Sequence, residues 1–415
     1  MTGTDIPAPR RAGPRTDDFV SSRQSPFLRG PEEVSTIYRV TTAAALLPVL
    51  GGVVLFGWRA AVVTAIAVAS CAGMEWLYYR VSRAPALLGR SHAYLTGVLL
   101  AMTLPAGVPW YIPAVAGAFA ILVGKAIFGG VGHFLWQPAL VGRLAVGVLF
   151  ASAMNPTLWP LLGQDKLFWG DLREAKEVQG APAGDSWLGR PAPEGADAVL
   201  LPPPAAVLAG LSHGEDPQYS AIAYWPDFSS VPKPRPTLLS HLPSIPEMLL
   251  GARGGGIGET SIALIVLGGF YLMYRGWVKW QLPVAMLAAA GLVAAAAPIR
   301  LAGAGDPPVT IQVWWPALAG DSDVGMLYVC YQLFGGGLVL SAFFLATEMT
   351  TRPVTTGGQV VFGAGCGALA MALQLYADTS IPAYLAVLAL NTLTPLIESV
   401  CRPRVLGTSR LPWRR

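Results

Sequence analysis

The sequence has few charged residues. Lys, Arg, Asp and Glu together make up 13% of its 415 residues, whereas hydrophobic residues make up 53% and the mean hydropathy is +0.50. A water-soluble domain carries roughly a quarter charged residues, so this deficit indicates a protein whose surroundings are lipid. The small net charge of +4 comes without a basic stripe or a nucleic-acid-binding module, which excludes a nucleic-acid partner.

Cysteine and histidine are also scarce. The sequence has four residues of each type, no CxxC pair, and no HExxH, GxSxG or P-loop motif, so neither a hydrolase nor a metal or iron–sulfur site made by this chain alone is expected. Three of the four cysteines fall inside apolar runs, where they are expected to act as small core residues. These three are Cys71, Cys330 and Cys366.

Long apolar runs dominate the remainder of the chain. Runs of 16 to 23 residues are long enough to cross a bilayer as helices or nearly so. They lie near residues 40–58, 60–79, 91–106, 109–128, 139–155, 259–275, 281–299, 325–347, 357–376 and 381–400. Gly97 is expected to break the third run and Gly335–Gly337 the eighth, while Pro105 closes the third. The predicted fold is an all-α polytopic membrane protein with about ten transmembrane helices.

The distribution of Lys and Arg predicts the orientation in the membrane. Basic residues gather in the N-terminal segment, in alternate short loops and in the tail, and such loops are typically cytoplasmic. The polar N-terminal stretch, with six Arg before the first apolar run, is not a cleavable signal. The predicted organisation is a cytoplasmic segment (1–38), a first five-helix half (39–155), an outer loop (156–258), a second five-helix half (259–400) and a basic cytoplasmic tail (401–415).

A faint internal repeat accompanies this division. The stretch Thr96–Thr103 is similar to Gly337–Thr347, and each lies in the third run of its half. Because five helices are an odd number, the two halves are expected to be inverted relative to each other, with a central binding site at their broken helices. Chance similarity between two stretches rich in Gly, Leu and Ala is the alternative.

Two groups of residues are candidates for chemistry. The glycine-rich stretch Gly254–Gly258 is either a flexible approach to a helix, with Glu259, Thr260 and Ser261 as acceptors at the helix start, or a set of backbone N–H groups that bind a phosphate. Ionisable residues at the apolar runs either pair or reach the membrane surface, or they line a path for an ion or a proton. These ionisable residues are Glu75, Lys125, Glu348 and Glu398.

An ordered set of segments resembles one protein family. Together the segments span roughly residues 25 to 405 and read SPFLR (25–29), LTGVLLAMTLP (95–105), VGKAIFGGVG (123–132), QPALVGR (137–143), GIGETS (256–261), GGLVLSAFFLAT (336–347), PVTT (353–356), FGAG (362–365) and NTLTPLI (391–397). In this order they resemble the D-type membrane subunit of the Rnf electron-transport complex. That family is related to the B-type membrane subunit of the sodium-pumping NADH:quinone oxidoreductase.

The resemblance implies a redox role in a bacterial inner membrane. Members have ten helices in two inverted halves and carry FMN on a Thr of a Ser-Gly-Ala-Thr motif in the outer loop, attached by a flavin transferase. Thr237 is the aligned candidate for covalent FMN. Gly256, Gly258, Glu259 and Thr260 are the further candidates for contact with a flavin, including riboflavin or FMN held without a covalent bond. The chain is then expected to relay electrons between partner subunits, with coupled Na⁺ or H⁺ transport, and not to act as an enzyme alone.

The sequence departs from the family pattern at three places. Pro234-Arg235-Pro236 replaces the flexible Ser-Gly-Ala before Thr237, and prolines stiffen the backbone. Arg90-Ser91-His92 stands where members usually have Asp-Gly-Ser, and the stretch 133–136 replaces a more polar Gln-Asn segment. These departures leave two alternatives open: a cofactor-poor membrane scaffold of a divergent redox complex, and a secondary transporter.

Overall fold

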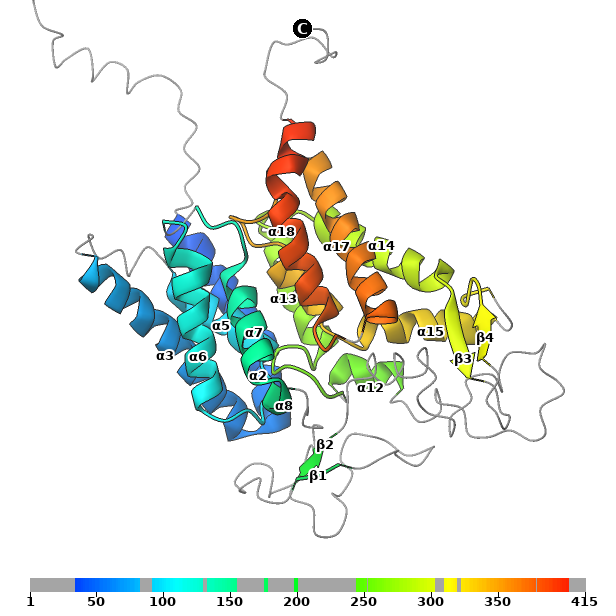
Figure 1. The fold of residues 1–415 in the computed structure, drawn as a ribbon, viewed down its shortest axis with the longest axis horizontal. Helices are drawn as coiled ribbons and strands as arrows, with labels where there is room; N and C mark the ends of the chain where they lie inside the picture. The colour runs from blue at the N-terminus through cyan, green and yellow to red at the C-terminus, as the bar shows by residue number, and fades with distance from the viewer. Residues whose placement is uncertain are drawn as a thin grey trace, which may run out of the picture.

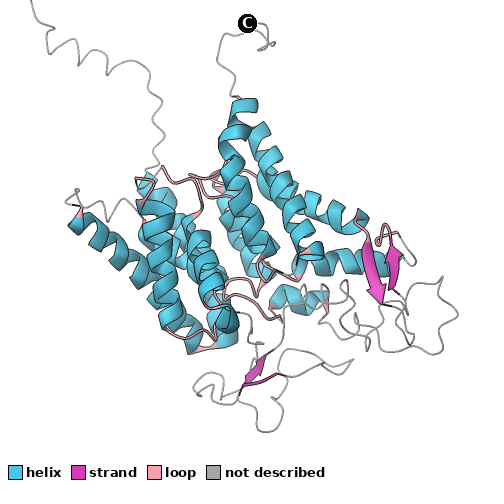
Figure 2. Ribbon diagram, viewed as in Figure 1, coloured by secondary structure: helices cyan, strands magenta, loops and turns pink. Residues whose placement is uncertain are grey.

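A computed structural model gives the fold of this chain (Figure 1). It describes residues 34–82, 92–129, 133–154, 175–177, 198–200, 244–251, 253–302, 310–318, 322–377 and 379–402. The described residues form a helical bundle with two small two-stranded sheets toward one end (Figure 2). The helices of the first part are α2 (Val34–Phe56), α3 (Trp58–Val81), α5 (Ala93–Thr103), α6 (Tyr111–Ile121), η2 (Leu122–Ala126), α7 (Pro138–Leu149) and α8 (Ala151–Met154).

The second part contains a comparable set of helices. They are α12 (Ile245–Leu250), α13 (Ile262–Tyr274), α14 (Gln281–Ala296), α15 (Ser322–Phe334), α16 (Leu338–Leu340), η5 (Ser341–Leu345), α17 (Thr356–Tyr376) and α18 (Pro382–Val400). The short strands β1 (Ala175–Glu177) and β2 (Ala198–Leu200) pair in parallel, and β3 (Ile299–Ala302) and β4 (Thr310–Val313) pair antiparallel.

Within the described ranges, four helices are long and apolar enough to cross a membrane. These are α2, α3, α17 and α18, and the pair formed by α15 with α16 and η5 is a fifth if this bent pair is one span. Five shorter apolar helices accompany them: α5, α6 with η2, α7, α13 and α14. Each of the ten predicted apolar runs therefore contains a helix or a broken helix, and the prediction of a polytopic membrane protein agrees with the structure.

Proline and glycine set several of the helix ends. Gly57 has φ 74° and separates α2 from α3, a backbone conformation that glycine adopts without strain. Leu104, with φ −90° and ψ 139°, is extended because it precedes Pro105, and α5 therefore ends at Thr103. At its 11 residues, α5 is only about 16 Å long, roughly half the thickness of a bilayer core.

The prediction that Gly97 breaks the third run is wrong. Gly97 lies inside α5, and a Cβ at this position would stand 2.6 Å from Cα of Val68 on α3. The glycine therefore allows two helix backbones to approach closely, as small residues do in membrane proteins. The prediction for Gly335–Gly337 is confirmed, because α15 and the α16–η5 segment meet there at an angle of 62°.

Corresponding helices of the two parts make corresponding contacts. Helix α6 packs against α3 and α7, and α17 packs against α14 and α18. Glycines lie at equivalent interfaces: a Cβ on Gly117 would stand 2.9 Å from Cβ of Ser70, and a Cβ on Gly363 would stand 2.7 Å from the carbonyl oxygen of Leu282. Helix α2 of the first part contacts α13 of the second.

The similar stretches Thr96–Thr103 and Gly337–Thr347 are not related as an inverted repeat requires. Thr96, near the start of α5, lines the same pocket as Glu348, which follows η5. The start of one stretch and the end of the other thus lie at the same end of the molecule. An inverted repeat would place equivalent positions at opposite ends, so this particular similarity does not relate the two halves.

The starting end of α2 and the final turns of α18 lie at one end of the bundle (Figure 1). Tyr38 of α2 lines the pocket that contains Glu348. The hydroxyl of Thr394 on α18 donates to the carbonyl of Thr351, three residues beyond Glu348, at 3.1 Å. The first and last described helices therefore approach the same side of the molecule.

Candidate functional site

The broken helices meet a third segment at the centre of the protein. The stretch between α12 and α13 runs alongside the end of α5, where Pro105 and Gly256 form an isolated bridge. The backbone N–H of Ile257 donates to the carbonyl of Leu104, and that of Gly258 donates to the carbonyl of Met102, both at 2.9 Å. A segment of the second half thereby satisfies carbonyl groups that the helix end would leave without partners.

Arg253 closes the end of α15. Its side chain is 1% exposed, and its guanidinium donates to the carbonyl of Phe334, the last residue of α15, and to that of Gly336 at 3.3 Å. It also donates to the carbonyl of Glu259. One side chain thus joins the break between α15 and α16 to the segment that precedes α13.

Arg143 does the same for α5. It lies on α7, is buried, and its Nε donates to the carbonyl of Thr103, the last residue of α5, at 3.0 Å. Thr103 in turn donates its hydroxyl to the carbonyl of Leu100 at 2.7 Å. Each of the two broken helices therefore ends at a buried guanidinium.

Glu259 lies between these two arginines. Its carboxylate accepts the N–H of Gly256 at 2.9 Å, and both guanidinium charges interact with it. Its Oε1 and the hydroxyl oxygen of Tyr384 lie 2.9 and 2.8 Å from the position that a Cβ on Gly337 would occupy. A carboxylate, two guanidinium groups and a phenol therefore surround the break, within a protein interior that excludes water.

Most of the predicted glycine-rich site has a structural role in this arrangement. A Cβ on Gly256 would stand 2.6 Å from the carbonyl oxygen of Met102, so the close approach requires glycine. The N–H groups of Gly256, Ile257 and Gly258 already have acceptors within the chain, which does not fit a phosphate bound by these groups. The helix-start alternative fits: Ser261 is the N-cap of α13 and accepts the N–H of Leu264.

Thr260 is fully buried beside this segment. Its hydroxyl donates to the carbonyl of Ile257 at 3.4 Å, so it is directed into the segment and not toward the start of α13. Contact of Gly256, Gly258, Glu259 or Thr260 with a flavin stays a prediction. Thr237 and Arg90 lie outside the described residues.

Three of the four predicted ionisable residues gather at a second place. Lys125 Nζ and Glu75 Oε1 form an ion pair at 2.8 Å, with both side chains at least 96% buried. Lys125 and Glu348 line the same small pocket. Glu398 lies apart and accepts the N–H of Val354 at 3.1 Å. The predicted pairing alternative therefore holds for Glu75 and Lys125, while Glu348 faces a pocket.

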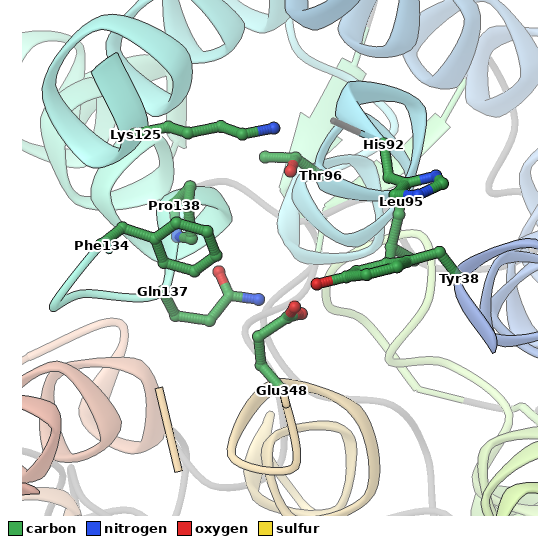
Figure 3. A pocket seen from close by; sticks show the side chains of 9 residues that line it. All are labelled: Tyr38, His92, Leu95, Thr96, Lys125, Phe134, Gln137, Pro138 and Glu348. Carbon is green, nitrogen blue, oxygen red and sulfur yellow. The ribbon is translucent and has the colours of Figure 1, made fainter. Parts of the chain in front are cut away.

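The pocket joins side chains from both halves. Tyr38, Gln137 and Glu348 are directed toward one space, with Thr96 and Lys125 on its other side (Figure 3). Its full lining is Tyr38, His92, Leu95, Thr96, Lys125, Phe134, Gln137, Pro138 and Glu348. Gln137 also caps α7, because its Oε1 accepts the N–H of Ala139 at 2.8 Å, which fixes this side chain at the pocket edge.

Aromatic rings and burial control the polar groups of the pocket. The rings of Tyr38 and His92 stack with centroids 4.3 Å apart, and His92 Nδ1 is hydrogen bonded to the Tyr94 hydroxyl at 2.6 Å. Burial lowers the pKa of His92, assisted by the nearby charges of Lys125 and Arg39. Burial raises the pKa of Glu348, which lies in the turn after η5, to about 7, against the opposing charges of Lys125 and Arg352.

Several of these residues escaped the sequence interpretation. Arg143 was used only to orient the chain, although it falls inside the fifth predicted run, and a charge inside such a run is itself a signal. Arg253 directly precedes the glycine-rich stretch, but its carbonyl partners are about eighty residues away in sequence. Tyr384 has no local motif, and only the fold brings it to Glu259.

Fold and centre together define the class of protein: a polytopic membrane protein with broken helices that meet at a buried charged site. The chain belongs to the NQR2, RnfD, RnfE family, whose model matches residues 21–407.

Named relatives match nearly the whole chain, and each is the D-type subunit of its complex. The chain is similar to that of the ion-translocating oxidoreductase complex of Stutzerimonas stutzeri, with 33% identity over 367 residues that cover 88% of this chain and 89% of that protein. It is 29% identical to that of the proton-translocating ferredoxin:NAD(+) oxidoreductase complex of Clostridium ljungdahlii, over 93% of this chain and 96% of that protein. It is 27% identical to that of the Na(+)-translocating ferredoxin:NAD(+) oxidoreductase complex of Acetobacterium woodii, over 93% and 95%.

Proposed function

We propose that this chain is the D-type membrane subunit of an Rnf-type ion-translocating oxidoreductase complex. The observation that carries the proposal is the family match over residues 21–407. The buried charged centre at two broken helices supports it, because such breaks in membrane proteins commonly handle ions. In the complex, the chain relays electrons through flavin between partner subunits and contributes to ion movement; it does not catalyse a reaction alone.

Transport by the assembled complex tests this function. Inverted membrane vesicles that contain the complex are given reduced ferredoxin and NAD⁺, the substrates in the names of two relatives. Ion uptake is expected with the complete complex and is expected to be lost when this chain is deleted. Because one of these relatives is named proton-translocating and the other Na⁺-translocating, a protonophore and a Na⁺ ionophore are compared to identify the ion. Uptake that persists without the chain would contradict the proposal.

The proposed topology has ten spans in two inverted five-helix halves, with both termini in the cytoplasm. The repeated contact scheme of α3, α6 and α7 with α14, α17 and α18 supports two equivalent halves. Basic residues near the ends of α3 and α13 and before α17 support a cytoplasmic location of that side; these residues are Arg80, Arg275 and Arg352. Residues 156–258 then form the outer loop, and the shorter helices cross the membrane together with the extended segments that continue them.

Covalent FMN at Thr237 is the proposed cofactor attachment. The chain is co-expressed with a flavin transferase, and the denatured protein is examined for flavin fluorescence in a gel. Thr237→Ala is expected to remove the fluorescence, while Ser240→Ala, three residues away on the same loop, is expected to retain it. Flavin that is released on denaturation supports riboflavin or FMN held without a covalent bond.

A cofactor-poor scaffold is the second candidate. It is favoured by the Pro234-Arg235-Pro236 sequence in place of the flexible approach to the attachment threonine. A complex that assembles and transports ions while this chain carries no flavin of either kind would support the scaffold. A solute transporter would instead require transport by this chain alone in liposomes, without an electron donor.

A further inference from the structure

The carbonyl groups at the ends of broken helices are the usual places for a cation in membrane transport proteins. A helix C-terminus leaves its last carbonyls without helical partners and carries about half a negative charge. In this chain two such ends lie near the centre, at Thr103 of α5 and at Phe334 of α15. Both ends are therefore electrostatically suited to a monovalent cation.

The protein's own side chains occupy both places. Arg143 donates to the Thr103 carbonyl at 3.0 Å, and Arg253 donates to the Phe334 and Gly336 carbonyls. Both arginines are at least 95% buried, so neither guanidinium extends to the membrane surface. Each binds where a hydrated or partly dehydrated cation would otherwise bind.

The charges at this centre nearly cancel. Two guanidinium groups and the Glu259 carboxylate give one net positive charge, and two helix ends of about half a negative charge each offset it. The carboxylate also holds the N–H of Gly256, which ties it to the same segment that carries Arg253. A further cation arriving at the centre would make it positive in surroundings of low dielectric constant, which is strongly unfavourable.

The geometry points to a cation barrier: we propose that Arg253 and Arg143 block the centre of this protein to Na⁺ and to hydrated protons by occupying the carbonyl ends of α15 and α5. This inference rests on the proposed function, because it states how a component of an ion-translocating complex avoids a passive leak. Glu259 is the positioning residue that balances the two arginines. Passage of an ion through the centre requires a guanidinium to leave its carbonyl partners.

Passive leak through the assembled complex tests the barrier. The complex is reconstituted into liposomes without an electron donor, and the influx of radioactive Na⁺ and the decay of an imposed pH gradient are measured separately. Arg253→Gln and Arg143→Gln are each expected to raise the leak of at least one cation several-fold. Arg253→Lys keeps the charge and is expected to stay near the leak of the unmutated complex.

Two further variants separate charge from packing. Arg352→Gln is the matched control, because Arg352 also donates to a backbone carbonyl, that of Trp277 at 2.8 Å, but lies in the turn before α17. It is expected to leave the leak unchanged. Glu259→Gln removes the negative charge with little change in shape, so the centre becomes more positive and the leak is not expected to rise.

Three results would overturn the barrier. These are an unchanged leak in the assembled glutamine variants of both arginines, a leak in Glu259→Gln as large as in Arg253→Gln, or an equal rise in Arg352→Gln. If Arg253→Gln does not assemble, Arg143→Gln supplies the comparison. Electron-driven uptake by the unmutated complex is measured in the same preparation, so that a failure of the proposed function is distinguished from a failure of the barrier.

Discussion

At the scale of single residues, burial decides what each charge does. The Glu75–Lys125 pair is held at 2.8 Å between α3 and η2, and both side chains are at least 96% buried. A buried pair offsets the cost of removing its two ions from water only while both partners are present. The pair therefore fixes η2 against α3 and holds the Lys125 side chain beside the pocket.

Removal of one partner is expected to be much worse than removal of both. Lys125→Met leaves a carboxylate without its cation and should lower the free energy of unfolding by about 3–5 kcal/mol. The double variant Glu75→Gln, Lys125→Met should recover most of this loss, because it leaves no buried charge alone. Thermal unfolding of the detergent-solubilised protein measures both. A double variant as unstable as the single one would show that packing, and not charge, explains the loss.

At the scale of helices, glycine allows the close contacts that hold the bundle together. Gly97 of α5 lies against the backbone of α3, where a Cβ would meet Val68 Cα at 2.6 Å. Gly73 lies on α3 itself, and a Cβ there would meet nothing within 4 Å. The same residue type thus has opposite roles at two positions on neighbouring helices.

This difference predicts opposite effects of the same substitution. Gly97→Ala must push α5 away from α3 and is expected to lower stability by about 1–3 kcal/mol, as overpacking does. Gly73→Ala is expected to raise stability by about 0.5–1 kcal/mol, because alanine loses less conformational entropy in a helix. Paired thermal unfolding curves check both, and equal effects at the two positions would contradict the proposed α3–α5 contact.

At the scale of the whole molecule, the ends of the described chain share one side. Tyr38 and Glu348 line one pocket, and Thr394 is hydrogen bonded to Thr351. An even number of membrane crossings between α2 and α18 follows. This agrees with ten spans and disfavours any odd number.

Reporter fusions are expected to place both termini in the cytoplasm. A cytoplasm-active reporter fused after Met1 or after Arg415 should be active, and one inserted at Ser240 should not be. A periplasm-active reporter should give the reverse pattern at all three places. Termini on opposite sides would contradict the proposed topology and with it the outer position of Thr237.

The sequence alone determined the class of protein and the number of apolar helices. Long apolar runs have no stable place in water, and their spacing is local information, so the ten runs and the break at Gly335–Gly337 were predicted correctly. Pro105 also ended α5 as expected, since the constraint on Leu104 is local. The ordered family motifs were likewise readable, and the match over residues 21–407 confirms them.

Only the tertiary structure decided what the central residues do. Gly97 has the sequence context of a helix break, but its role follows from Val68 on another helix. Arg253 meets Phe334, Arg143 meets Thr103, and Lys125 meets Glu75, at separations of 81, 40 and 50 residues. Hydrogen bonds and ion pairs between distant segments depend on how helices pack, and that packing leaves no local pattern in the sequence.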